Sequence, residues 1–350
     1  MRAGFPRRVL VIADQVAATQ WISFARPLAD CDDLVLDMQS QGLPDPRIAA
    51  RFAEAAPDLL VLSRMTGPEG AIWITQARAA GIPVLFHIDD DLLAVPLSLG
   101  REKYQAYNAP DRLRALRANM EASDLVYAST AALADALRGH GIKTPIVAGA
   151  VYCSVNPRRL AVPLTCAGGP VIGYMGTAGH AADLAEILPV VEELMLTLPE
   201  LQFEIFGGLD IPPPLRRFEN RVRSIAPVGD YRAFLEKLQS LGWWIGLAPL
   251  QDTGFNRCKA DTKWVEYSLS GMAVVAADLP VYHRACADGA GMLAADHAAW
   301  RQAIKALLFD PDLRKRVTMQ ARHQLETVYT HAALRAQISD IFAQAIARAG

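Results

Sequence analysis

Short apolar runs alternate with longer segments of helical periodicity along the first 150 residues. The runs are rich in β-branched residues and too short for buried helices, so they are interpreted as strands. They lie at Val9–Ala13, Leu59–Ser63, Val84–Ile88, Leu125–Ser129 and Ile146–Ala150. Helical spacing is found between them at Ile72–Ala80, Asp111–Ala122 and Ala131–Gly139. Apolar strands separated by helices predict a parallel sheet that is covered on both faces.

The second half of the chain repeats this alternation. Its predicted strands are Val171–Met175, Phe203–Phe206, Arg223–Ala226, Ile245–Pro249, Val274–Ala277 and Met292–Ala294. Helices are predicted at Ala181–Thr197, Tyr231–Leu241, Thr262–Ser270 and Ala298–Phe309, and a last helix at Ala332–Ala349. The pattern therefore predicts a second parallel α/β sheet, followed by a long helix that leads to no further strand.

A segment with little periodicity separates the two halves. Residues 156–170 contain three prolines and the pair Gly168-Gly169, which is typical of a linker. We expect a first domain at residues 1–160, a second at 170–328 and a terminal helical segment at 329–350. Both domains are predicted to be doubly wound, Rossmann-like α/β units with a cleft between them. Open parallel sheets bind ligands beyond the carboxyl ends of their strands, so the loops there are the candidate sites.

Composition and charge narrow the class of protein. The chain is 52% apolar and 21% charged with a formal net charge of -2, which is typical of a globular protein and gives no reason to expect a nucleic-acid partner. No apolar run reaches the ~18 residues of a membrane span, and Val9–Ala13 is too short for a signal peptide. The five cysteines contain no C-x-x-C pair, which favours reduced thiols and a cytoplasmic protein.

Glycines follow three predicted strands of the second half. The first turn contains Gly176 and Thr177 and runs to His180, the second contains Gly207 and Gly208, and the third contains Val228, Gly229 and Tyr231. Glycine lets a backbone approach a ligand closely, and helix N-termini offer free N–H groups to an anion. A single turn of this kind is equally consistent with packing. Three of them at one sheet edge favour a binding edge.

The strongest local signal is the segment from Asn256 to Gly271, which carries Arg257, Lys259, Lys263 and Glu266. Glu266 lies three residues after Lys263, on the same face of the predicted helix. That spacing is consistent with an exposed helical ion pair of little energetic weight. The alternative is functional: cations near the start of the helix would neutralise a diphosphate, and the carboxylate would accept hydrogen bonds from ribose hydroxyls.

The second half resembles the donor domain of GT-B-fold glycosyltransferases, especially the retaining group called glycosyltransferase family 4. The stretches that carry the resemblance are Val171–Gly176, Phe203–Gly208, Ala226–Tyr231, Gly246–Leu250 and Asn256–Tyr282. That family has two glutamates at a fixed spacing. The second contacts the donor ribose and matches Glu266, whereas the first contacts the donor sugar and matches Cys258. The family has a basic pair near the first glycine turn that binds the donor phosphates. Gly176–His180 contains no such pair, so we expect Arg257, Lys259 and Lys263 to supply the positive charge that binds the phosphates.

The resemblance implies a retaining transferase that moves a sugar from a nucleoside diphosphate sugar to a hydroxyl of a glycan, lipid-linked or protein acceptor. Lys259, Lys263 and Arg257, with helix N-termini, would stabilise the leaving diphosphate. The resemblance also implies that the last helix returns to the first domain, and that no metal or separate cofactor is needed. Two alternatives remain. One is a nucleotide-sugar epimerase of the same architecture. The other is a non-catalytic nucleotide-sugar-binding protein, which is suggested mainly by Cys258 at the position of the sugar-contacting glutamate.

In the first half, the predicted strand Val84–Ile88 runs directly into Asp89, Asp90 and Asp91. Adjacent like charges require solvent, cations or helix N-termini, so an N-cap in a solvated loop and a Mg²⁺ site are both open. An Ile-Asp-Asp-Asp-Leu stretch at this place is similar to bacterial polysaccharide and protein glycosyltransferases. By the same resemblance, His87 would line the cleft near the donor sugar; a structural role is the alternative.

The acceptor side is less well marked. Arg64 follows a strand end, where it would hold an acidic acceptor or pair with Glu69. The segment from Arg101 to Arg117 contains five basic residues, consistent with a solvated face or with contact to anionic lipid or polysaccharide. Peripheral contact with the inner membrane face is therefore an open alternative. The first turn, Ala13–Val16, lacks the glycine pair of family 4.

Overall fold

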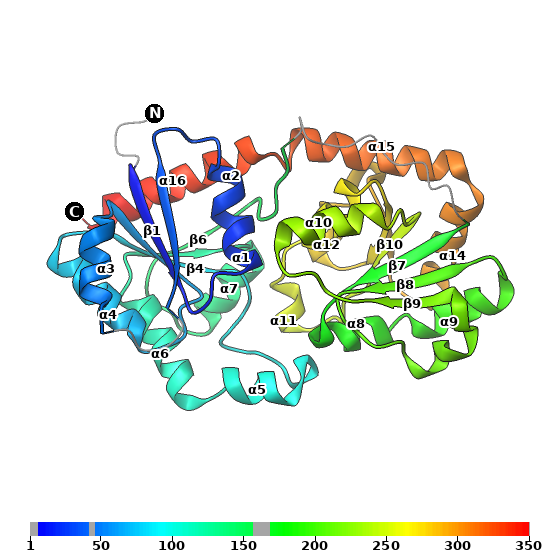
Figure 1. Ribbon diagram of the computed structural model, residues 1–350, viewed down its shortest axis with the longest axis horizontal. Coiled ribbons are helices and arrows are strands. Elements are labelled where there is room, and N and C mark those ends of the chain that lie inside the picture. Colours follow the sequence, from blue (N-terminus) through cyan, green and yellow to red (C-terminus); the bar gives the residue numbers. More distant parts are fainter. Residues whose placement is uncertain (1–5, 42–45, 157–168, 350) are drawn as a thin grey trace.

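The computed structural model describes residues 6–41, 46–156 and 169–349. Two six-stranded sheets lie side by side, each with helices on both faces, and every strand pairing is parallel (Figure 1). The predicted pair of doubly wound α/β units is thereby confirmed. Most of the predicted linker, and Cys166 within it, lie outside the described residues.

The first sheet has the strand order β2-β1-β3-β4-β5-β6. Its strands are β1 (Arg8–Ala13), β2 (Val35–Ser40), β3 (Leu59–Ser63), β4 (Val84–Ile88), β5 (Leu125–Ala128) and β6 (Ile146–Ala148). The pattern did not predict β2, because this edge strand is only partly buried and carries polar residues such as Asp37 and Gln39. β1 leads to β2 on one side and β3 lies on the other, so the winding reverses between β1 and β3.

Helices cover both faces of this sheet. Leu10 and Ile12 pack with the helices of one face, whereas Val9 and Val11 pack on the other, so the strands are apolar throughout. The helical segments are α1 (Ala18–Gln20), the π-helical turn η1 (Trp21–Ala25), α2 (Arg26–Leu28), α3 (Ile48–Ala55), α4 (Glu69–Ala79), the 3₁₀ turn η2 (Leu97–Leu99), α5 (Arg101–Tyr107), α6 (Pro110–Glu121) and α7 (Ala131–Gly139).

The second sheet has the order β12-β11-β10-β7-β8-β9, with the winding reversed between β7 and β10. Its strands are β7 (Val171–Met175), β8 (Gln202–Phe206), β9 (Val222–Ile225), β10 (Ile245–Ala248), β11 (Ala273–Ala277) and β12 (Met292–Ala294). Its helices include the 3₁₀ turn η4 (Ala178–His180), α8 (Ala181–Ala185), α9 (Leu188–Thr197), α10 (Tyr231–Ser240), α11 (Gly254–Arg257), α12 (Thr262–Leu269) and α14 (His297–Phe309).

One predicted helix of this unit is wrong in its extent. Residues 181–197 form two helices, α8 and α9, rather than one. Pro189 occupies the first turn of α9, where its missing N–H costs nothing. In the middle of a continuous helix, the same residue would remove a hydrogen bond and clash with the preceding turn.

The chain returns to the first sheet at its end. α15 (Pro311–Thr327) runs along the second unit, and α16 (His331–Ala349) packs against α2, β4 and β5 (Figure 1). The Gln337 side chain fixes this return, because its Oε1 accepts hydrogen bonds from the amides of Ala150, at 2.7 Å, and Val151, at 2.9 Å. The expected return of the C-terminal helix is thus confirmed. Across the described ranges, no helix is both long and apolar enough to span a membrane.

Candidate functional site

The carboxyl-end loops of the two sheets meet, and α12 brings the main charged side chains to this junction. Tyr267 fixes the helix: its hydroxyl accepts a hydrogen bond from the Met175 amide at 2.8 Å and donates one to the Leu247 carbonyl at 3.0 Å. Its ring lies against Gly246, where an added Cβ would come within 2.4 Å of it. Anchored at the ends of β7 and β10, α12 holds Lys263 and Glu266 at the winding reversal of the second sheet.

The glycine turns form the rim beside α12. Gly207 has φ +122°, and a Cβ there would lie 2.7 Å from the Gly176 carbonyl oxygen, so these two turns touch through their backbones. Thr177, Gly208 and Gly229 are exposed, whereas Val228 and Tyr231 are half-buried. Gly207 therefore has a packing reason to be glycine, and the exposed positions leave this rim open to solvent.

Glu266 is buried at the junction, with only 7% of its surface exposed. Burial raises the pKa of its carboxyl to about 7, against the opposing effects of a hydrogen bond with Tyr231 and the charges of Lys263 and Arg26. Burial therefore disfavours the ionised form of this group, and hydroxyl donors from a ligand would favour the carboxylate form.

Lys263 is half-buried beside it, with its Nζ 5.7 Å from the centre of the Tyr174 ring. Burial lowers the pKa of Lys263 to about 8, although the charges of Glu266 and Asp183 counteract it. Within the residues that the structure describes, its ammonium group forms neither a hydrogen bond nor an ion pair. An ammonium in such surroundings has unused donors that an anionic ligand would satisfy.

The turn after β7 contributes a neutral histidine, which the sequence pattern marks only as part of a glycine turn. His180 Nδ1 lies 3.0 Å from Asp183 Oδ2, and the same carboxylate accepts the Gln251 amide at 3.0 Å and Asn256 Nδ2 at 3.2 Å. The charge of Lys263, together with burial, lowers the pKa of His180 to about 4. This turn therefore adds a polar group but no positive charge near pH 7.

Lys259 lies between the two units. Its Nζ donates to Asp90 Oδ1 of the first unit at 3.2 Å and sits 4.7 Å from the centre of the Phe255 ring. The neighbouring Cys258 is buried, and its carbonyl accepts a hydrogen bond from Thr130 Oγ1 at 2.8 Å. The Cys258 thiol points to the carbonyls of Gly254, at 3.3 Å, and Ala132, at 3.8 Å. Cys258 therefore faces the first unit.

Arg257 lies apart from this group. Its guanidinium is exposed and forms a two-point ion pair with Asp252, with a 2.7 Å contact to Oδ2. Lys259, Lys263 and Glu266 are brought together, whereas Arg257 is directed to the surface.

His87 does not line the junction in this structure. It is fully buried in the first unit between Phe24 and Tyr127, whose ring centres lie 4.9 Å and 5.0 Å from its own. Its Nδ1 lies 2.9 Å from Ser63 Oγ, and burial lowers the pKa of the ring to about 4. A neutral histidine packed among aromatic rings fits the structural alternative better than the expected contact with the donor sugar.

The three carboxylates after β4 have different sets of partners, although Asp89 and Asp90 share Arg64. Asp89 accepts hydrogen bonds from Thr19, at 2.8 Å, and Tyr152, at 2.7 Å, and pairs with Arg64. Asp91 is buried and lies 2.9 Å from His140 Nε2, and Asp90 faces Lys259. In the described part of the chain, no three His, Cys, Asp or Glu side chains are grouped to hold a metal ion.

The structure also settles the partners of the basic residues in the first unit. Arg64 pairs with Asp89 and Asp90 rather than with Glu69, because β3 and β4 are in register from Ser63 to His87. Arg114 pairs with Asp111, and Arg112 packs over the Tyr107 ring at 4.0 Å. All of α5 except Tyr107 is exposed. Arg101 and Lys103 of α5 therefore lie on a solvated face, whereas Arg112 and Arg117 are half-buried.

One further residue of the junction carries no signal in the sequence pattern. Arg26 begins α2, and its guanidinium carbon lies 5.5 Å from the centre of the Tyr231 ring on the other unit. Among the described residues it has no ion-pair partner. It was not predicted because residues 18–28, which include a π-helical turn, show no regular periodicity.

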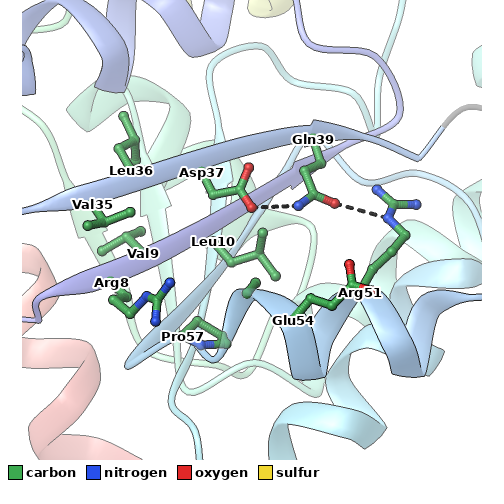
Figure 2. A pocket seen from close by; sticks show the side chains of 11 residues that line it. Arg8, Val9, Leu10, Val35, Leu36, Asp37, Gln39, Arg51, Glu54 and Pro57 are labelled. Carbon is green, nitrogen blue, oxygen red and sulfur yellow. Dashed lines mark hydrogen bonds between the residues drawn. The ribbon is translucent and has the colours of Figure 1, made fainter.

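A separate hollow of about 390 Å³ lies away from this junction (Figure 2). It is formed at the edge of the first sheet between β1, β2 and α3, where Gln39 links Asp37 to Arg51 through hydrogen bonds. None of the predicted site residues lines it.

Similarity to known proteins is found in structure rather than in sequence. No protein-family model matches the sequence, and no curated protein matches it. Among solved structures, Anabaena HepE in complex with UDP and glucose has a TM-score of 0.67 at 14% identity, over 95% of this chain and 99% of that chain. Sucrose-phosphate synthase from Thermosynechococcus elongatus has a TM-score of 0.66 at 14% identity, over 97% of this chain and 100% of that chain. The α,α-trehalose 6-phosphate synthase from Burkholderia multivorans has 0.64 at 12%, over 96% of each chain.

These similarities span both sheets and the helix that returns to the first. At such low identity they establish the fold and not the substrate. The fold is the one expected from the resemblance, GT-B.

Proposed function

We propose that this chain, which has the GT-B fold, is a glycosyltransferase that takes a sugar from a nucleoside diphosphate sugar and transfers it to an acceptor hydroxyl. The observation that carries the proposal is the pair Lys263 and Glu266 on α12. A half-buried ammonium, without a hydrogen-bond or ion-pair partner among the described residues, lies beside a buried carboxylate at the winding reversal of the sheet. A nucleoside diphosphate offers what both groups lack: phosphate oxygens for Lys263 and ribose hydroxyls for Glu266.

Each residue of the junction has a role in this proposal. Glu266 holds the ribose, and the exposed backbone of the glycine rim approaches the phosphates. Lys263, with Lys259 beside it, stabilises the charge that grows on the diphosphate as the sugar bond breaks. Arg26 and Tyr231 lie next to Glu266 and would contact the nucleoside. These roles draw their positive charge from side chains, so they require no metal ion.

Retention of the anomeric configuration belongs to the proposal through the resemblance to family 4. We assign no protein nucleophile or base: in a front-face reaction the leaving phosphate takes the proton of the acceptor hydroxyl. Closure of the two units would exclude water and bring donor and acceptor together. The proposed acceptor is a glycan, a lipid-linked saccharide or a protein, met in the cytoplasm or at the inner membrane face.

A thermal-shift screen tests the donor half of the proposal. UDP and UDP-glucose are the first probes, because HepE was crystallised with both, followed by GDP-, dTDP- and CMP-sugars. A ligand at one hundred times its Kd stabilises the folded state by about 2.7 kcal/mol, which shifts the melting temperature measurably. If none of the four nucleotide classes raises the melting temperature or gives heat in calorimetry, the proposed function is wrong.

A second candidate is a protein that binds nucleotide sugars without transferring them. It is favoured by Cys258, since the residue matched to the sugar-contacting glutamate faces the first unit and bonds to its backbone. Release of UDP from a bound donor, assayed with and without a panel of saccharide acceptors, separates the candidates. Tight binding with no release from any donor would favour the non-catalytic protein.

A further inference from the structure

The ion pair between Asp90 and Lys259 joins the two units at the junction. The Asp90 carboxylate is held on both oxygens: Oδ1 accepts from Lys259 Nζ and Oδ2 from Arg64, each at 3.2 Å. Both partners of the inter-unit pair are mostly shielded, with 22% of the Asp90 side chain and 18% of the Lys259 side chain exposed. Pairs in such surroundings are screened less by salt than surface pairs, so this contact carries more weight than an exposed one.

The first unit holds Asp90 firmly in this direction. Asp89 and Asp91 bind other side chains of the first unit, and Asp90 is the one of the three that pairs with a cation of the second unit. Arg64 reaches Asp90 with its backbone at φ +53°, a left-handed conformation that costs on the order of 1 kcal/mol for a residue other than glycine. Strain of this kind persists only where the surroundings impose it, and here Arg64 pairs with both Asp89 and Asp90.

The loop of Lys259 is anchored beside the pair as well. The carbonyl of Cys258 is bound by Thr130, whose hydroxyl also caps α7 by accepting the Leu133 amide at 3.1 Å. Lys259 is therefore fixed through its neighbour's backbone and through its own ammonium, both to the first unit. The Lys259 ammonium nevertheless acts on the second unit, because its positive charge helps to lower the pKa of His180 and of Lys263.

We infer that Asp90 is a positioning residue: it holds the Lys259 ammonium, from the opposite unit, at the place where the donor's diphosphate would bind. This inference rests on the proposed function. An ammonium has three N–H donors, so Lys259 can keep one on Asp90 and turn the others to phosphate oxygens. Full stabilisation of the leaving group then depends on both units being together.

The test uses the full chain with Asp90→Asn, Lys259→Ala and the double variant. The control is Asp135→Asn, which alters an exposed Asp–Arg pair of the same unit. Since Lys259 stays present but loses its fixed position, Asp90→Asn is expected to lower the turnover of UDP release about tenfold and to change the Kd for UDP less than about threefold. In the Lys259→Ala background, Asp90→Asn should lower turnover less than about twofold further, because the two residues act as one pair.

A second readout needs no turnover. Reductive methylation of lysines, quantified by mass spectrometry, should modify Lys259 several-fold faster in Asp90→Asn than in the wild type, with exposed Lys143 as reference.

If Asp90→Asn does not fold, Lys259→Met replaces it, since the loss of this charge alone should then lower turnover about tenfold. Unchanged turnover in the folded variant, an equal loss in both backgrounds or an unchanged methylation rate would each overturn the inference. A wild-type protein that binds no nucleotide would instead refute the proposed function.

Discussion

The carboxyl edges of the two sheets are built on opposite principles. The edge of the second sheet is formed by glycine turns and by Lys263 and Glu266, whose charged groups are incompletely satisfied by the protein. The edge of the first sheet is formed by charged side chains that satisfy one another, as Asp89 does with Arg64, Thr19 and Tyr152. Charged groups that the protein satisfies incompletely can bind a ligand that satisfies them, whereas a network whose members satisfy one another provides rigidity.

Removal of the Lys263 charge should give the largest effect on the donor edge. Lys263→Ala is expected to lower the turnover of sugar transfer or UDP release by about 10²–10³-fold, because a cation that stabilises the leaving group is lost. The control is Lys315→Ala, an exposed lysine on α15 of the same unit. Single-turnover rates equal to those of the wild type would contradict the leaving-group role, and with it the contrast between the two edges.

The Glu266 carboxylate should affect binding more than turnover. Glu266→Ala is expected to weaken donor affinity by more than about tenfold, since a charged acceptor of ribose hydroxyls is lost. Isothermal titration with a hydrolysis-stable donor measures this, and unchanged affinity would contradict the ribose assignment.

The pH dependence of stability provides a second test of Glu266. Its pKa is raised to about 7 in the folded state, so between about pH 4.5 and about pH 7 the folded state binds more protons than the unfolded state. This carboxyl therefore favours folding at low pH, and the advantage is lost as the pH rises through 7. Glu266→Gln should gain stability relative to the wild type as the pH rises over that range, and a tenfold difference in proton affinity between the two states corresponds to about 1.4 kcal/mol. A difference in melting temperature independent of pH would show that the group titrates normally.

The first edge should respond in stability rather than in donor binding. Tyr152→Phe removes one hydroxyl donor from the largely buried Asp89 carboxylate, and the free energy of unfolding should fall by about 1–2 kcal/mol. Chemical denaturation measures the loss, and calorimetry with UDP should give an unchanged Kd. A weakened UDP affinity at full stability would reverse the comparison, because it would place this network in the donor site.

The smallest effect is expected for Arg257. Its guanidinium is exposed and paired with Asp252, so Arg257→Ala should change turnover and UDP affinity by no more than about threefold. A loss as large as that of Lys263→Ala would indicate that the loop rearranges on binding and brings Arg257 to the phosphates.

Features that depend on local information could be predicted from the sequence. Eleven of the twelve strands agree with the predicted ranges within a residue or two, and most of them are buried, continuous apolar runs; the edge strand β9 is an exception. The missing strand, β2, is an edge strand with polar residues on its partly covered face, so its pattern resembles a loop. The proximity of Lys263 and Glu266 could be predicted because residues three apart lie on the same face of a helix. The division of the predicted helix at Pro189 was also available in the sequence, since proline favours the first turn of a helix.

The partners of the charged groups could not be predicted in the same way. Arg64 has Glu69 close in sequence, yet it pairs with carboxylates that the register of β3 and β4 brings beside it. His87 lies at the end of a strand in either interpretation. Its burial depends on tertiary contacts, because the rings of Phe24 in η1 and Tyr127 in β5 pack against it.

The sequence by itself determined the alternation of strands and helices, the glycine rim and the spacing of Lys263 and Glu266. The periodicity of apolar residues and the spacing of residues along a helix are properties of a few consecutive residues, so they depend little on tertiary contacts. Tertiary structure decided that Asp90 meets Lys259 across 169 residues, that Arg26 reaches Tyr231, and that Cys258 faces the first unit. Those contacts depend on how two separately wound sheets are packed together, and a pair of charges has no preference for one partner until packing brings that partner within a few ångströms.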